Sequence, residues 1–230
     1  MHTWASAATH VGRRPRNEDA SYVDCDVGFF VVADGMGGHG GGDVAARLVV
    51  NSMATTFRTL RRDAAMKDRM STVFEIANGA VKRQQAGALR DMGATAVALC
   101  VSRGTGMLAH VGDSRAYRLR EGRIERLTRD HSYVEMMRAA GMAAPHHLAH
   151  IVTRALGRDD AAPELRAISV LPGDVYLLCS DGVSDVMPDP HLKLMLERIY
   201  HPANAADAIV ERSISVGGHD NATAAVIRID

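Results

Sequence analysis

The chain has 230 residues, a length that fits one domain with a substantial core. Its 27 basic and 27 acidic residues give a formal net charge of zero, which argues against a nucleic-acid-binding protein. Basic residues gather between Arg58 and Arg69, but acidic residues are interleaved with them. We therefore interpret this segment as a solvated helix face and expect no nucleic acid among the partners.

The cysteines and the N-terminus indicate a cytoplasmic protein. Cys25, Cys100 and Cys179 lie far apart, form no Cys-x-x-Cys pattern and have apolar neighbours, so we expect reduced, buried thiols. The N-terminus lacks the basic start and apolar core of a signal peptide. No segment reaches the roughly 18 consecutive apolar residues of a membrane span. We expect one domain over residues 1–230, cytoplasmic, monomeric and without membrane contacts.

The first predicted element is a buried strand. The apolar run "GFFVVAD" over residues 28–34 is short and begins at a glycine, as buried strands do. Apolar residues at helical spacing then predict a helix over 43–60, and a second helix is predicted over 64–85. Residues 93–104 predict another strand, followed by a glycine-containing turn.

The second half of the chain continues this alternation. Residues 106–128 predict two or three strands with a hairpin turn at Glu121–Gly122. A short helix should end at Gly141, and the weakly periodic segment after it is interpreted as a mobile surface segment. The remaining predicted elements are a strand over 174–182, helices over 190–199 and 202–216, and a strand over 221–230. Many strands with paired helices indicate antiparallel sheets layered with helices rather than a βαβ repeat.

Carboxylates occur at five points where a predicted strand meets a turn. The set is Glu18 with Asp19, Asp34, Asp113, Asp181 and Asp220. If these sites converge, they form a cluster without balancing cations, which would repel itself unless a positive ion filled it. Oxygen ligands favour Mg²⁺ or Mn²⁺, and no Cys or His pair has zinc-site spacing. The alternative is that each Asp-Gly is an ordinary turn, so the residues alone leave both interpretations open.

Eight sequence blocks resemble, in the same order, those of the metal-dependent Ser/Thr protein phosphatases, the PPM or type 2C class, in their bacterial form. They are "GRRPRNED", "VVADGMGGHGGGDVA", "GATAVAL", "AHVGDSRAYRLREG", "LTRDHS", "TRALG", "LCSDGVSD" and "HDNATAAVI", and they cover nearly the whole chain. The resemblance implies an α+β fold, a four-layer α-β-β-α sandwich of two antiparallel sheets flanked by helix pairs. It also implies hydrolysis of phosphoserine or phosphothreonine on proteins with Mn²⁺ or Mg²⁺.

Four residues would hold the two metal ions that the resemblance implies. Asp34 would bridge them, and the carbonyl of Gly35 would bind the second ion. Asp181 and Asp220 would complete the shell of the first ion. In this chemistry the two ions lower the pKa of a bridging water, and the hydroxide attacks phosphorus in line. A cysteine nucleophile is the rival phosphatase chemistry, but none of the three cysteines lies in a phosphate-binding loop.

The other matched residues would act around these ions. Glu18 and Asp19 would hold metal-bound waters. Asp113 would ligate a possible third, weaker ion, which Asp181 would share. Arg14, four residues before Glu18, would grip the substrate phosphate through its guanidinium group.

Two features depart from the family pattern. Met36 stands where eukaryotic members carry a histidine proposed to protonate the leaving group, so the general acid is open between His39 and a metal-bound water. For His39, loop packing is the alternative interpretation. The flap of bacterial relatives is also shortened here, which implies altered specificity and weakens the case for a third metal. Its histidines, His146, His147 and His150, are interpreted as surface loop residues.

Three functions follow as hypotheses. The first is an active protein phosphatase that opposes a bacterial Ser/Thr kinase and acts on phosphorylated proteins. The alternatives are a phosphoprotein-binding pseudophosphatase and a small-molecule phosphoesterase. Inactive relatives usually lose a metal-binding aspartate, whereas Asp34, Asp181 and Asp220 are all present, which favours the enzyme.

Overall fold

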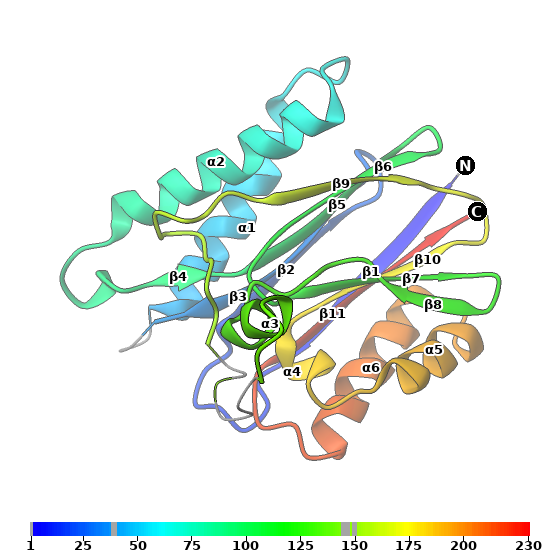
Figure 1. Ribbon diagram of the computed structural model, residues 1–230. Helices are drawn as coiled ribbons and strands as arrows, with labels where there is room; N and C mark the ends of the chain where they lie inside the picture. The colour runs from blue at the N-terminus through cyan, green and yellow to red at the C-terminus, as the bar shows by residue number, and fades with distance from the viewer. Residues whose placement is uncertain (1, 38–40, 144–147, 149–150) are drawn as a thin grey trace.

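Two antiparallel sheets pack face to face, and helices cover both outer faces (Figure 1). The computed structural model describes residues 2–37, 41–143, 148 and 151–230. The layers run helices, sheet, sheet, helices. This is the α+β four-layer sandwich that the resemblance implies, so that prediction is confirmed.

Each sheet is built from strands that are far apart in the sequence. One five-stranded sheet has the order β1 (Thr3–His10), β11 (Ala222–Ile229), β10 (Val175–Cys179), β7 (Arg115–Arg120) and β8 (Arg123–Arg126). The other has the order β2 (Asp19–Asp24), β3 (Phe29–Met36), β5 (Ala96–Ser102), β6 (Thr105–Val111) and β9 (Glu164–Ser169), and the short β4 (Gly93–Ala94) pairs with the end of β3.

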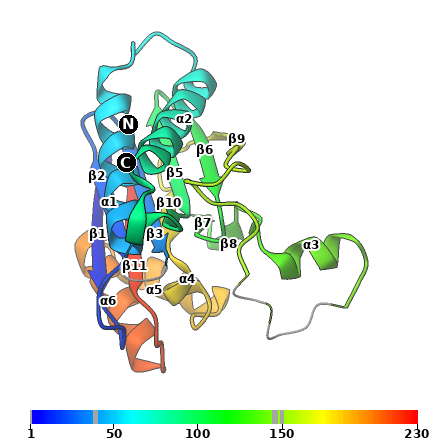
Figure 2. The ribbon, with the colours of Figure 1, turned by 90° about the vertical axis from the view of Figure 1, so that its left-hand side faces the viewer.

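Helices cover the outer face of each sheet in pairs. The β3 sheet is covered by α1 (Gly42–Thr59) and α2 (Met66–Gln84), and the β10 sheet by α5 (Asp189–Arg198) and α6 (Pro202–Ser215). Three short helices lie in connections: a 3₁₀ helix (Gly87–Leu89), α3 (Tyr133–Ala139) and α4 (Asp181–Ser184). Figure 2 shows α3 standing away from the sandwich. Among the described residues, no helix combines the length and apolarity needed to cross a bilayer.

The core explains why β3 is continuously apolar. Successive side chains of a strand point to opposite faces. Phe29 and Val31 pack under α1 and α2, where the ring of Phe29 stacks on Phe57 at 4.2 Å between centroids. Phe30 and Val32 face the other sheet and pack in the middle of the sandwich. Both faces of β3 are therefore buried, and neither alternates with polar residues.

Most predicted elements are present with shifts of one or two residues at their ends. The hairpin between β7 and β8 turns at Glu121 and Gly122, which have φ values of 48° and 70°. Positive φ at both positions is typical of the two-residue turns that match the twist of a hairpin. Gly141, with φ of 70°, directly follows the C-cap of α3, so the predicted helix end is also confirmed.

Three strands were not predicted. β1 and β2 are mostly half-exposed and β9 is mostly exposed, and small or charged residues interrupt their apolar pattern. The predicted strand over 93–104 is in fact two, because the chain leaves the ladder at Thr95 between β4 and β5. Strands at sheet edges, or strands that few side chains cover, show only a weak apolar periodicity in the sequence.

The interpretation of Arg58 to Arg69 as a solvated helix face is right about solvent exposure for most of its basic residues, but wrong about a single helix and about Arg69. α1 ends at Thr59, because Leu60 adopts an extended conformation, and α2 begins only at Met66. Arg69 is buried. The basic residues therefore lie at the end of α1, in the loop between the two helices and at the start of α2.

The three cysteines are unpaired, as expected, but they are not all buried. Cys100 and Cys179 are buried, whereas Cys25 is exposed. Cys25 lies in the turn between β2 and β3, where the carboxylate of Asp24 accepts hydrogen bonds from the backbone amides of Asp26 and Val27. The expectation of burial is wrong for Cys25, because a turn that faces solvent carries it.

Candidate active site

The predicted site residues converge at one end of the sandwich. Seven of the eight line a single open cleft of about 730 Å³: Arg14, Glu18, Asp34, Gly35, Asp113, Asp181 and Asp220. Asp19, the eighth, is half-buried beside this cleft, and its carboxylate interacts electrostatically with those of Asp34 and Asp220. The two sheets end here together, which brings side chains from distant parts of the sequence into one place.

Strand geometry places the first two carboxylates. Asp34 has the same parity along β3 as Phe30 and Val32, so it points toward the space between the sheets, where that space opens to solvent. Asp19, the first residue of β2, is directly opposite Asp34 in the antiparallel register. Cross-strand neighbours lie on the same face, so β2 and β3 deliver a pair of carboxylates.

The second sheet brings two more carboxylates to the same edge. Asp181 follows β10 and begins α4, and Asp220 lies two residues before β11. β10 and β11 pair along their length, so both acids lie at the same end of the sheet. A Cβ on Gly182 would lie 2.0 Å from the carbonyl oxygen of Asn221, so only glycine permits this approach.

The glycines around α1 serve close packing. The amide of Gly35 donates to the carbonyl of Glu18 at 3.0 Å. A Cβ on Gly35 would lie 2.0 Å from the carbonyl oxygen of Gly42, and one on Gly42 would lie 2.7 Å from Oε2 of Glu18. The first residue of α1 can thus lie against β3 and the Glu18 side chain.

The cleft concentrates more negative charge than it can stabilise by itself. Burial, with the charges of Asp181 and Asp19, raises the pKa of Asp34 well above its ordinary value. Burial and the charge of Asp113 do the same to the pKa of Asp181. Burial also raises the pKa of Asp19 to about 6, although Ser180 donates a hydrogen bond to it, and that of Asp113 to about 6.

Two buried carboxylate oxygens of the predicted site residues have no hydrogen-bond partner among the described residues. They are Oδ1 of Asp19 and Oδ1 of Asp181. An unsatisfied buried acceptor costs about 1–3 kcal/mol, and more when it is charged. Hard divalent cations take such oxygens as ligands, and no histidine or cysteine of the described chain lines the cleft. The residues present therefore fit a Mg²⁺ or Mn²⁺ centre.

Arg14 is the one predicted site residue with a positive charge. Its Nη2 atom lies 2.6 Å from Oδ2 of Asp220, so the expectation of a cluster without any balancing cation is wrong. The two side chains are 58% and 40% exposed. An exposed pair of this kind contributes about 0–1 kcal/mol, so Arg14 can exchange Asp220 for another anion at little cost.

Asn221 was not among the predicted site residues, yet it fastens the loop that carries Arg14. Its Nδ2 atom donates to the carbonyls of Val11 and Arg16 at 2.7 and 2.9 Å. Its Oδ1 atom accepts from the amide of Glu18 at 2.8 Å. The only sequence signal was its place beside Asp220 in the block "HDNATAAVI".

A second residue that sequence reasoning missed is His131, which holds the loop of Asp113. Its Nδ1 atom accepts from the amide of Gly112 at 3.1 Å, and its own amide donates to the Gly112 carbonyl at 2.9 Å. His110 stacks on its ring. Because Nδ1 accepts, Nε2 carries the proton, 3.6 Å from the carboxylate of Glu164. This protonation leaves His131 no lone pair for a metal, although potential ligand atoms of these three side chains lie within 4.8 Å of one another.

The two departures from the family pattern are only partly visible. Met36 ends β3 and lines the cleft. His39 and the flap histidines His146, His147 and His150 lie outside the described residues. Their proposed roles stay predictions, as does the mobility of the flap.

Comparison with known proteins decides the family. The profile of the protein phosphatase 2C family matches residues 8–215. The chain belongs to this family. Serine/threonine protein phosphatase PstP of Mycobacterium tuberculosis is 33% identical to it, over 93% of this chain and 42% of PstP. The chain thus spans less than half the length of that relative.

Solved structures of family members share the whole fold. The catalytic domain of PstP, crystallised in complex with two manganese ions, has a TM-score of 0.91 and 32% identity, covering 100% of this chain and 99% of that one. PppA of Pseudomonas aeruginosa, described as a key regulatory component of T6SS, has a TM-score of 0.87 and 35% identity, with coverage of 99% and 98%.

Proposed function

We propose that this protein hydrolyses phosphoserine and phosphothreonine in proteins, using two Mn²⁺ or Mg²⁺ ions and a possible third. The observation that supports this most is the convergence of Asp34, Asp181 and Asp220 in one cleft of a protein phosphatase 2C family member. The two manganese ions in the PstP catalytic domain are consistent with it. We propose that a bacterial Ser/Thr kinase supplies the phosphorylated substrates.

The carboxylates are proposed as the metal site. Asp34, the Gly35 carbonyl, Asp181 and Asp220 would hold two ions, and Asp113 with Asp181 a third. Bound ions would supply an activated bridging water for attack on phosphorus and neutralise charge in the transition state. This assignment accounts for the raised pKa values and unpartnered oxygens of the cleft, because cations stabilise the ionised carboxylates.

The residues around them have positioning and binding roles. Glu18 and Asp19 would hold water molecules of the metal shell; Asp19 is itself oriented by a 2.8 Å hydrogen bond from Ser180. Arg14 would release Asp220 and donate to two phosphate oxygens, a geometry that a guanidinium group matches well. Asn221 would keep the Arg14 loop in register with Glu18.

The open cleft is compatible with a substrate presented on a protein. Arg16 and Arg158 also line it and give the cleft two further positive charges beside Arg14. Such charges favour the encounter with a phosphorylated segment. The monomeric state and the cytoplasmic location stay predictions.

The test is phosphate release from a phosphothreonine peptide with Mn²⁺ and with EDTA. We expect release with Mn²⁺ and none with EDTA. Peptide binding without release would indicate the pseudophosphatase instead. Hydrolysis of small phosphoesters with no action on phosphoserine or phosphothreonine peptides would indicate the small-molecule phosphoesterase.

A further inference from the structure

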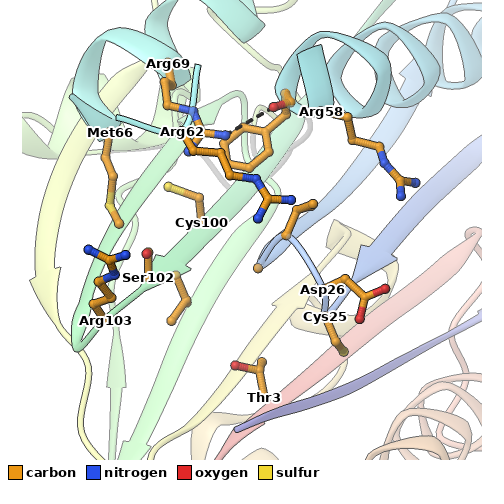
Figure 3. Close-up of a pocket in the computed structure, with 14 residues that line it drawn as sticks. Thr3, Cys25, Asp26, Arg58, Arg62, Met66, Arg69, Cys100, Ser102 and Arg103 are labelled. Carbon is orange, nitrogen blue, oxygen red and sulfur yellow. Dashed lines mark hydrogen bonds between the residues drawn. The ribbon is translucent and has the colours of Figure 1, made fainter. Parts of the chain in front are cut away.

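A second pocket, of about 230 Å³, lies at the other end of β3 (Figure 3). Gly28 at this pocket and Asp34 in the cleft are about 20 Å apart along an extended strand. The pocket is enclosed by the β2–β3 turn, the end of α1, the start of α2 and the β5–β6 turn. It is therefore separate from the proposed catalytic centre.

The lining of this pocket is strongly basic. It contains four arginines, Arg58, Arg62, Arg69 and Arg103, against one carboxylate, Asp26. Arg58 is ion-paired outside this set, with Asp24 at 3.2 Å. Within the part of the chain that the structure describes, the other three arginines have no carboxylate within 4.0 Å. Three guanidinium charges thus share the pocket without a protein counter-ion.

Arg69 is the buried member of this group. Only 9% of it is exposed, its guanidinium carbon lies 3.9 Å from the centre of the Phe57 ring, and Nη2 donates to the Phe57 carbonyl at 3.1 Å. Its Nε–H is buried and has no partner among the described residues. Burial, with a contribution from the like charge of Arg62, lowers the pKa of Arg69. A bound anion would stabilise this buried guanidinium, because it would accept from the unused N–H donor and offset the repulsion from the second cation.

We propose that this pocket binds a phosphate-class oxyanion, held by Arg62, Arg69 and Arg103. Figure 3 shows these three side chains around Cys100 and Ser102, with Asp26 on the far side of the pocket. Guanidinium groups donate paired hydrogen bonds to tetrahedral oxyanions. The pocket therefore suits phosphate better than it suits an apolar ligand without charge. The anion is free phosphate or a phosphate monoester, because both present a doubly charged phosphate group to the arginines.

The first experiment is an NMR titration of ¹⁵N-labelled protein in EDTA with inorganic phosphate. The backbone amides of Gly28, Ser102 and Arg103 report the pocket, and those of Gly35 and Asn221 report the catalytic cleft. We expect saturating shifts at the first set. Shifts confined to the second set would overturn the proposal, whatever the outcome for hydrolysis.

A second titration separates the two sources of the anion. A phosphothreonine peptide is compared with inorganic phosphate and with the same peptide unphosphorylated, all in EDTA so that no hydrolysis intervenes. Tighter binding of the phosphopeptide at the pocket amides supports a monoester ligand, and equal or weaker binding supports free phosphate. Equal binding of the unphosphorylated peptide would overturn a phosphate-specific site.

Matched variants test the residues. Arg62→Gln and Arg103→Gln should each weaken phosphate binding at the pocket amides about tenfold, the loss expected for one charge-assisted contact. Arg61→Gln is the control, because Arg61 is adjacent, pairs with Asp63 and does not line the pocket. Unchanged amide spectra elsewhere show that the fold is intact. Equal affinity in all three variants would contradict the assignment.

Discussion

At the scale of single residues, the cleft depends on backbone contacts that leave no room for a Cβ. Gly35→Ala would place a Cβ 2.0 Å from the Gly42 carbonyl oxygen and 2.7 Å from that of Glu18, so β3 or the start of α1 must move. We expect a loss of at least about 2 kcal/mol in the free energy of unfolding, measured by urea denaturation. A change below about 0.5 kcal/mol would contradict the packing described.

Arg14 is expected to act on substrate binding. Arg14→Ala should raise KM for a phosphothreonine peptide by about tenfold, the value of one charge-assisted contact, with a smaller effect on kcat. Steady-state kinetics with Mn²⁺ measures both. Arg13→Ala is the control, because Arg13 does not line the cleft. A fall in kcat with unchanged KM would show that Arg14 does not clamp the ground-state phosphate.

At the scale of elements, α2 contains a glycine that lowers the stability of the helix. Gly79 lies inside this helix, and a Cβ there would meet only Nη1 of Arg83 at 3.2 Å, the end of a flexible side chain. Gly79→Ala should therefore raise the free energy of unfolding by about 0.5–1 kcal/mol. Urea denaturation measures this change. Comparison with Gly35→Ala separates the effect of helix propensity, which stabilises, from the effect of a packing clash, which destabilises. Destabilisation would mean that α2 needs the glycine.

The elements that could be predicted are those with an uninterrupted pattern. β3 and β10 are continuous apolar runs, and α1 repeats its buried residues every three or four positions, so each can be recognised from its sequence. β1, β2 and β9 could not be recognised, because they are partly or largely exposed and their apolar residues follow neither the helical nor the strand period. The burial of Arg69 could not be recognised either. A charged residue is expected to be exposed to solvent, whereas the aromatic face of Phe57 accommodates this one in a buried position.

At the scale of the whole molecule, the carboxylates of the site could be predicted but the residues that hold them could not. The motif blocks named Asp34, Asp181 and Asp220, and the two sheets bring them together. The contacts of Asn221 with Glu18 join residues 203 positions apart, and no local pattern in the sequence signals them. The same holds for the ring of His131 on the Asp113 loop.

The stability of the metal-free protein should depend on pH in an unusual direction. The folded-state pKa values of Asp19 and Asp113 are about 6, above their ordinary value of 3.8. Folding therefore favours the protonated form, so stability is lost as pH rises from about 4 through about 6. In EDTA, Tm should be higher by at least about 3 °C at pH 5 than at pH 7.

Metal should reverse this trend. Metal binding requires ionised carboxylates, so the stabilisation that Mn²⁺ gives should grow from pH 5 to pH 7. Differential scanning fluorimetry with EDTA and with Mn²⁺ at each pH makes the comparison. If the pH trend of Tm were the same with and without Mn²⁺, the buried carboxylates would not be the metal ligands.

The proposed metal centre is tested most directly by Asp34→Asn, assayed for Mn²⁺-dependent phosphate release from a phosphothreonine peptide. Asparagine keeps the shape of the side chain but removes the charge proposed to bridge two ions, so hydrolysis should be abolished. The fold should persist, because the change relieves repulsion with Asp181. Asp207→Asn, on the exposed face of α6, is the control and should keep full activity. Full activity in Asp34→Asn would contradict the metal-bridge assignment.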